Sequence, residues 1–232
     1  MFQTIVKIFL LVIITAAITP FIRKLAFVLG AVDNPNARRI NKKPMPTIGG
    51  LAIFVAFNIG EFVLLRKDFP THELFSVLLA SSVIILTGLI DDILELKPRQ
   101  KMFGIFVAFL VVYFLAGIKV RELSLPFLGH IQLGWWSFPL TIFWILALTN
   151  AVNLIDGLDG LATGVTLISL VTMGIVGFFF LKSWQHYVPI MCIMLAACLL
   201  GFLPYNFHPA KIFLGDTGAL YIGFMISVLS LK

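Results

Sequence analysis

The stretch GLATGVTLISLVTMGIVGFFFL, residues 160–181, contains no charged side chain. At a rise of 1.5 Å per residue, a helix of this length is about 33 Å long, close to the hydrocarbon thickness of a bilayer, about 30 Å. A core helix of a soluble domain is usually shorter and has one polar face. The stretch therefore predicts a helix that crosses a membrane.

The rest of the 232-residue chain has the same character. Its composition is 60% hydrophobic and 12% charged, against about 45–50% and about 25% in ordinary globular chains. This excludes a soluble enzyme, a disordered chain and a coiled coil. We predict an all-α polytopic membrane protein with about eight transmembrane helices, at residues 3–29, 49–65, 74–90, 102–118, 137–153, 160–181, 188–206 and 217–231.

The basic residues predict the orientation of these helices. With eight spans, the loops after the first, third, fifth and seventh share one side, and that side carries ten Lys and Arg against five on the other. The positive-inside rule makes the richer side cytoplasmic and places the N-terminus outside. The net charge of +6 then reflects topology and phosphate binding, and we expect no nucleic-acid partner.

One loop on the outer side has a pattern of its own. Residues 119–135, KVRELSLPFLGHIQLGW, alternate loosely between apolar and polar side chains, with turn signals at Pro126 and Gly129. Alternation interrupted by such residues is typical of a hairpin. We expect a short β-hairpin on the outer surface.

Acidic residues gather on the predicted cytoplasmic side. Seven of the eleven lie there, and five of those begin or end an apolar run. A carboxylate at a membrane boundary is costly unless it is paired, hydrated or bound to a cation. The sequence therefore suggests a site for a hard cation in a cytoplasmic cleft.

The first motif is GLIDDILELKPRQK, residues 88–101. Successive helical residues differ in direction by about 100°, so Asp91 and Asp92 cannot both face one site. One can face the site while the other orients a lysine or a helix end. The alternative is a helix-end pair that Lys97 or Arg99 neutralises.

The second motif is NAVNLIDGLDGLATG, residues 150–164. Polar residues recur at every third position, but their direction drifts too far for one straight row of ligands. Three glycines interrupt the regular helix and allow close backbone approach. The residues concerned are Asn150, Asn153, Asp156 and Asp159 with Gly157, Gly160 and Gly164.

The third motif is FHPAKIFLGDTGAL, residues 207–220. Gly215 and Asp216 open an apolar run, and the free N–H groups of a helix start suit phosphate. Asp216 could be a helix cap, a metal ligand or both. Phe213 offers an aromatic face for a base, although lipid-facing bulk is an equal alternative.

The fourth motif is AVDNPNARRINKKPMPTIGGL, residues 31–51. Arg38, Arg39, Lys42 and Lys43 could bind lipid headgroups or the phosphates of a ligand. A plain topology signal explains the charge but not the ordered Pro and Gly positions. Together the four motifs support phosphoryl transfer at the membrane surface.

In these motifs and their order, the chain resembles the polyprenyl-phosphate N-acetylhexosamine-1-phosphate transferases of glycosyltransferase family 4. The GDTG form preceded by HPAKIF is more similar to the GlcNAc-1-phosphate branch. The resemblance implies a bacterial plasma-membrane enzyme that transfers GlcNAc-1-phosphate from UDP-GlcNAc to undecaprenyl phosphate. The products are undecaprenyl-diphospho-GlcNAc and UMP, the cofactor is Mg²⁺ (Mn²⁺ could replace it), and the product starts teichoic-acid or other envelope glycan synthesis.

The resemblance also implies roles for individual residues. The metal ligands are Asp216 and Asp156. The catalytic residues are Asp91, Asp92, Asp156 and Asn153, with Asp91 as the base toward the lipid phosphate. The uridine pocket is formed by Gly157, Leu158, Asp159 and Phe213, and Lys43, Thr47 and Lys101 are further candidates for contacts with the phosphates.

Several alternatives remain open. The donor could instead be UDP-MurNAc-pentapeptide, and a homodimer is possible. Residues 1–232 read as a single transmembrane transferase domain that lacks the family's C-terminal spans and His-rich loop, so we expect a fragment or an inactive, shortened relative. Other classes are a transporter or cation channel, which needs charges near the middle of several spans, and a catalytically dead scaffold.

Overall fold

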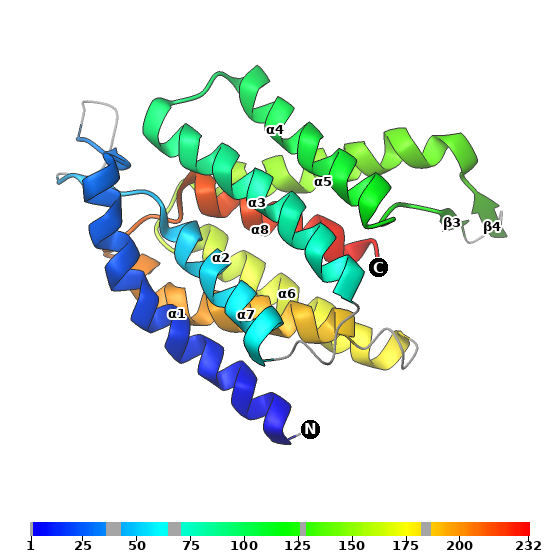
Figure 1. Ribbon diagram of the computed structural model, residues 1–232, viewed down its shortest axis with the longest axis horizontal. Coiled ribbons are helices and arrows are strands. Elements are labelled where there is room, and N and C mark those ends of the chain that lie inside the picture. The colour runs from blue at the N-terminus through cyan, green and yellow to red at the C-terminus, as the bar shows by residue number, and fades with distance from the viewer. Residues whose placement is uncertain (1, 36–42, 65–70, 126–128, 182–186) are drawn as a thin grey trace.

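The computed structural model describes residues 2–35, 43–64, 71–125, 129–181 and 187–232. Within them the chain forms eight α-helices and two small antiparallel strand pairs (Figure 1). The α-helices are α1 (Phe2–Leu29), α2 (Gly49–Ile59), α3 (Thr71–Leu94), α4 (Pro98–Leu110), α5 (Ser137–Ile155), α6 (Leu161–Phe180), α7 (Tyr187–Asn206) and α8 (Gly215–Ser230). Short π-helical turns, η1 (Gly60–Leu64) and η3 (Val111–Leu115), extend α2 and α4, and a 3-10 turn, η4 (Gly134–Trp136), precedes α5.

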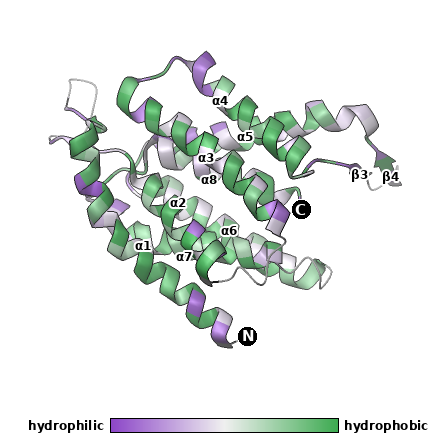
Figure 2. Ribbon diagram, in the orientation of Figure 1, coloured by the Kyte–Doolittle hydropathy of each residue, from purple (hydrophilic) through white to green (hydrophobic). Residues whose placement is uncertain are grey.

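The prediction of an all-α polytopic membrane protein is confirmed. In the described part of the chain, six helices are long and apolar enough to cross a membrane. The other two, α2 and α8, begin within two residues of the predicted runs at 49–65 and 217–231 and are shorter, with 11 and 16 residues. Figure 2 shows apolar residues along all eight helices.

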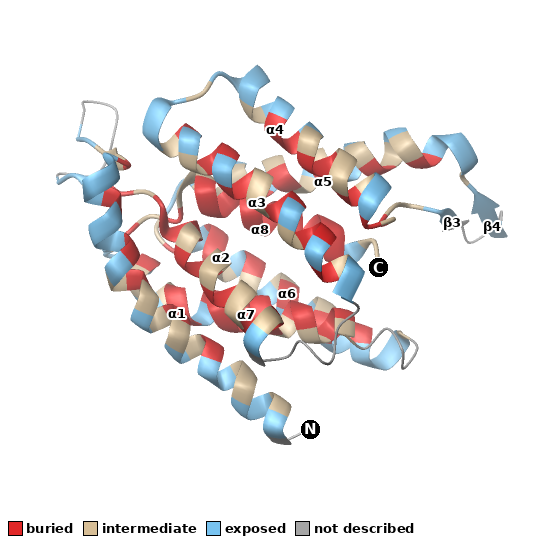
Figure 3. Ribbon diagram, viewed as in Figure 1, coloured by how far each residue is buried: buried red, intermediate tan, exposed pale blue. Residues whose placement is uncertain are grey.

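Helix α8 lies at the centre of the bundle. Every residue from Thr217 to Leu229 is buried, whereas α1 and α6 keep exposed faces (Figure 3). Neighbouring backbones approach α8 closely at glycines, because a Cβ on Gly50 would overlap Gly218 and one on Gly88 would overlap Thr217. Association through small residues is typical of membrane helices, which cannot rely on the hydrophobic effect.

The apolar side chains that remain exposed are those expected to face lipid. Phe21 of α1 is 71% exposed, Phe179 of α6 is 80% and Trp135 of η4 is 96%. In water such a surface would predict association or aggregation, but in a bilayer it is solvated by acyl chains. Trp135 and Trp136 lie at one end of the bundle, where aromatic side chains favour the interface.

Four connections meet at one end of the bundle, as the alternation of spans predicts. Backbone hydrogen bonds join the first and the last of them, from Phe213 N–H to Pro46 O and from Gly49 N–H to Phe213 O, and the bond from Thr47 N–H to Ala31 O lies within the first. Strands β1 (Val32–Asp33) and β2 (Met45–Pro46) pair within the first connection. We call this end the carboxylate end.

The opposite end contains the C-terminus and the predicted hairpin (Figure 1). Lys232 Nζ lies 2.7 Å from Glu73 Oε2 at the start of α3. Strands β3 (Glu122–Leu125) and β4 (Gly129–Gln132) pair antiparallel, with Glu122 opposite Gln132. The hairpin is therefore confirmed, although Pro126, which was predicted to turn it, lies outside the described residues.

Candidate active site

The start of α8 is capped by a side chain from another helix. Asp92, near the end of α3, accepts the N–H of Asp216 at 3.0 Å and the N–H of Thr217 at 2.9 Å. It also accepts the Thr217 hydroxyl at 2.5 Å. The first N–H groups of a helix have no partner within the helix, and a carboxylate there also interacts favourably with the helix dipole. Asp92 thus fixes where α8 begins.

Its neighbour Asp91 points to a different partner, as the 100° step along a helix requires. Asp91 is 5% exposed, and its Oδ2 lies 2.5 Å from Lys101 Nζ at the start of α4. Its Oδ1 accepts the N–H of Leu96 at 2.8 Å. The two aspartates thus face different partners, as predicted, with Asp92 at a helix end and Asp91 at the site beside a lysine. That lysine is Lys101, and not Lys97 or Arg99 of the alternative interpretation.

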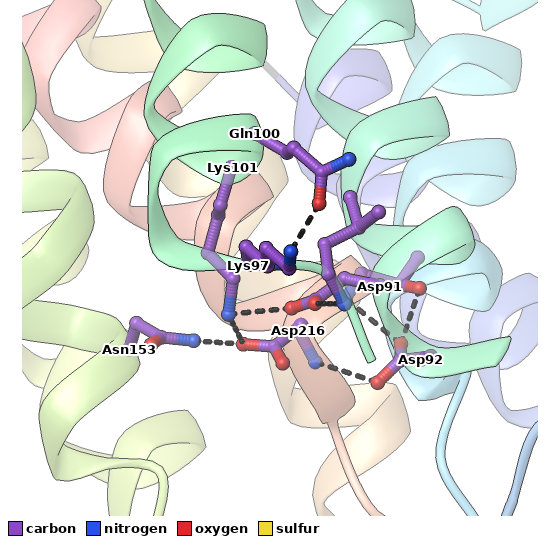
Figure 4. Close-up of polar contacts among 9 residues, drawn as sticks. Asp91, Asp92, Lys97, Gln100, Lys101, Asn153 and Asp216 are labelled. Atoms are coloured by element: carbon purple, nitrogen blue, oxygen red, sulfur yellow. Dashed lines mark hydrogen bonds and ion pairs between the residues drawn. The ribbon is translucent and has the colours of Figure 1, made fainter. Parts of the chain in front are cut away.

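Lys101 connects Asp91 to Asp216. Its Nζ lies 3.2 Å from Asp216 Oδ1, and Asn153 Nδ2 donates to that same oxygen (Figure 4). The side chains come from α3, α4, α5 and α8, so four helices converge on one carboxylate group. Asp216 is the side chain on which the predicted residues meet.

Asp156 follows the last residue of α5 and adds a further negative charge. Burial raises the pKa of Asp156 to about 8, and the charges of Asp216 and Asp92 act in the same direction. The nearby N–H of Gly215 lowers it. An acid in this position favours either a proton or a cation, because both relieve the repulsion between carboxylates.

Asp159, in the connection between α5 and α6, binds the loop between α7 and α8. Its Oδ2 accepts the N–H of Ala210 at 3.1 Å and lies 3.0 Å from His208 Nδ1. Gly160 precedes α6 with φ +72°, a conformation that favours glycine. Asp159 therefore positions the loop that leads to Asp216, and base reading by this residue stays a prediction.

One residue that supports the site was missed from the sequence. Asn206, at the end of α7, is 2% exposed; its Oδ1 accepts the Thr163 hydroxyl at 2.7 Å and its Nδ2 donates to Ile212 O at 3.1 Å. It ties α6 to the loop before α8. The only sequence signal was a polar residue ending a long apolar run.

Other predicted residues lie nearby without a shown role. Thr47 donates its hydroxyl to Ala31 O at 3.1 Å, and the Phe213 ring is half-buried. Lys43 and Gly157 are exposed, and Leu158 is 62% exposed. Their substrate contacts, and the cleft itself, remain predictions. Arg38, Arg39 and Lys42 lie outside the described residues.

Asn150, the first polar residue of the second motif, donates to Leu146 O at 2.7 Å within α5. One expectation for the motif fails, namely that all three of its glycines interrupt the helix. Gly164 lies inside the regular helix α6, with open space where a Cβ would be. The helix is interrupted only around residues 156–160.

The residues present fit a magnesium ion. Among the described residues, no three His, Cys, Asp or Glu side chains assemble into a metal-binding group. Mg²⁺ prefers oxygen ligands and is commonly bound by one or two carboxylates together with phosphates of the substrate. Asp216 and Asp156 offer that donor set, and the repulsion around Asp156 would be relieved by a cation.

The chain is similar to known proteins. The profile of Glycosyl transferase family 4 matches residues 74–232. The chain is 41% identical over 216 residues to a probable undecaprenyl-phosphate N-acetylglucosaminyl 1-phosphate transferase of Bacillus subtilis (strain 168), covering 92% of this chain and 58% of that protein. It is 35% identical over 222 residues to a phospho-N-acetylmuramoyl-pentapeptide-transferase of Clostridium botulinum (strain Eklund 17B / Type B), covering 91% and 67%.

The family profile covers all the carboxylates of the site, and the two relatives cover most of the chain. The chain spans 58% of the length of the Bacillus protein. On these grounds the chain is a bacterial-type multi-pass membrane protein that belongs to glycosyl transferase family 4.

Proposed function

We propose that this chain transfers GlcNAc-1-phosphate from UDP-GlcNAc to undecaprenyl phosphate, releasing UMP. The observation that carries the proposal is the convergence of Asp91, Asp216 and Lys101 with Asn153 at the carboxylate end. The similarity to the Bacillus transferase supports the choice of sugar. In that role the product would start teichoic-acid or another envelope glycan.

In the reaction, an oxygen of the lipid phosphate attacks the β-phosphorus of the nucleotide sugar. A new P–O bond forms, the bond from the β-phosphorus to the bridging oxygen breaks, and UMP leaves with that oxygen. Phosphate monoesters lose their second proton near pH 6, so the attacking oxygen is largely ionised at pH 7. The site therefore has to position anions and neutralise charge more than to remove a proton.

The roles of the four aspartates then differ in part from those expected from the sequence. Mg²⁺ bound by Asp216 and Asp156 would neutralise charge on the diphosphate. Asp92 would act by positioning the start of α8. Asp91, which is buried and paired with Lys101, would hold that lysine near the transferred phosphate, so we no longer assign it the role of base.

The orientation and location are part of the proposal. The carboxylate end contains the connections that have the excess of Lys and Arg, so we place it in the cytoplasm, where nucleotide sugars are made. The N-terminus then lies outside the plasma membrane. A transporter or channel is disfavoured because the described acidic residues, apart from the buried Glu61 of η1, lie at the ends of helices or in the connections between them.

The test is transfer of radiolabel from UDP-GlcNAc into lipid by membranes that contain the 232-residue chain and undecaprenyl phosphate. We expect Mg²⁺-dependent transfer that Asp216→Ala abolishes. UDP-MurNAc-pentapeptide is the competing donor, because relatives of that specificity are 35% identical. Label from that donor alone would replace GlcNAc in the proposal, and label from neither would contradict transferase activity of this chain.

A further inference from the structure

Lys101 occupies a position that a metal ion would also favour. Its ammonium lies between carboxylates of two helices, 2.5 Å from Asp91 Oδ2 and 3.2 Å from Asp216 Oδ1. The Lys101 side chain is 20% exposed and that of Asp91 is 4% exposed. Figure 4 shows the ammonium in contact with both carboxylates, and Asn153 at the same oxygen of Asp216.

The excess of negative charge around Asp216 explains why a cation is stabilised beside it. Asp91, Asp92, Asp156 and Asp216 are close enough for their charges to interact. Buried carboxylates without a counter-ion are strongly destabilising. Lys101 is the cation that the described structure places in contact with two of them, so it neutralises the group in the absence of metal.

The same oxygen cannot serve both cations. Oδ1 of Asp216 already accepts from Lys101 and from Asn153. A metal that binds this oxygen therefore displaces at least one of these two donors. Two positive charges within about 3–4 Å of each other also repel strongly. The contact with Lys101 is the longer of the two ammonium contacts, and Asp91 retains the lysine when it breaks.

We propose that Lys101 is an internal counter-ion that competes with the divalent metal for Asp216 and moves off this carboxylate when the metal binds. Lys101 stays paired with Asp91, so its displaced ammonium remains beside the site, where phosphates of the donor would meet it. It is a positioning residue in this role. The inference rests on the proposed metal site at Asp216. What it adds is that the metal displaces Lys101 from this carboxylate.

The test is metal affinity without any substrate. Mn²⁺ replaces Mg²⁺ because free Mn²⁺ is measured directly by its electron paramagnetic resonance signal, using the 232-residue chain in lipid nanodiscs. We expect Lys101→Met to bind Mn²⁺ at least tenfold more tightly than the unaltered chain. The matched control is Lys97→Met, which removes the same charge from an exposed side chain nearby; we expect a change of less than threefold.

The outcomes separate this inference from the proposed function. If Asp216→Asn binds Mn²⁺ as tightly as the unaltered chain, the proposed metal site is wrong. If Asp216→Asn loses binding but Lys101→Met binds no more tightly than Lys97→Met, only the counter-ion role is overturned.

A second measurement needs no variant and covers the case in which Lys101→Met does not fold. Lysines of the unaltered chain are acetylated briefly with and without Mn²⁺, and each site is quantified by mass spectrometry. Displacement predicts that Mn²⁺ raises the modification of Lys101 at least threefold relative to Lys97. An unchanged ratio would overturn the proposal.

Discussion

The two ends of the bundle both contain polar contacts between helices, but those contacts hold different things in place. At the carboxylate end, beside the side-chain contacts around Asp216, carboxylates also bind backbone groups of other elements: Asp92 accepts the N–H groups that begin α8 and Asp159 accepts the N–H of Ala210. At the opposite end, the contacts of Glu73 with Lys232 and Tyr187 join side chains only.

This difference affects how accurately the backbone is positioned at each end. A side chain that binds backbone fixes the path of the chain, whereas two long side chains can adjust to each other. A cavity of about 20 Å³ lies beside Glu73, large enough for about one water molecule. The carboxylate end should therefore tolerate few substitutions, and the opposite end should tolerate more.

The largest effect should come from the backbone contact between α2 and α8. In Gly50→Ala, the new Cβ would overlap the Gly218 backbone, which cannot rotate away as a side chain can. We expect a loss of about 3 kcal/mol or more in the free energy of unfolding, measured by denaturation in detergent. The control is Gly164→Ala, where the Cβ meets open space and should be neutral or stabilising by up to about 1 kcal/mol.

Asp92→Asn should come next. The amide presents only one accepting oxygen, and its NH₂ group would face the N–H groups of α8, so about 1–3 kcal/mol of stability is lost. We also expect at least tenfold slower transfer, measured as UMP release. Stability lost with full activity retained would show that the start of α8 need not be fixed for the reaction.

A smaller effect is expected for Asn206→Ala. The buried Thr163 hydroxyl and Ile212 carbonyl would lose their partner, at about 1–2 kcal/mol. Because Asn206 contacts no predicted ligand directly, transfer should fall less than for Asp92→Asn, and addition of Mg²⁺ should not restore it. The milder change Thr163→Ser keeps the hydroxyl and serves as the control.

The smallest effect belongs to the opposite end. Glu73→Gln removes an ion pair between side chains that are 28% and 19% exposed, and partly exposed pairs contribute between about 0 and 1 kcal/mol. We expect less than about 1 kcal/mol and no change in transfer. A loss of activity in this variant would abolish the distinction between the two ends.

Much of the fold was predictable from local pattern. The uncharged run at 160–181 became α6, and the alternation after residue 119 became the hairpin. The starts of α2 and α8 were also predicted to within two residues. The central position of α8 was not predictable, because an apolar run does not show whether its residues face lipid or other helices.

The site was predictable as a set of residues but not as a set of contacts. The 100° step separated the partners of Asp91 and Asp92, yet nothing local identified the start of α8 as the partner of Asp92. Asn206 and Glu61 were missed because each is a single polar residue in an apolar context. Pairing between residues more than 100 positions apart, such as Asp92 with Thr217, is a property of the assembled bundle.

The burial of α8 has a consequence for how the protein is made. During synthesis this segment leaves the ribosome after α2, α3, α5 and α7, all of which contact it. It presents almost no surface to lipid, so its neighbours must leave a gap between them until it arrives. We expect earlier intermediates in the membrane to be loosely packed, with Asp92 still lacking the N–H groups that it later binds, so the carboxylate site forms only when α8 enters.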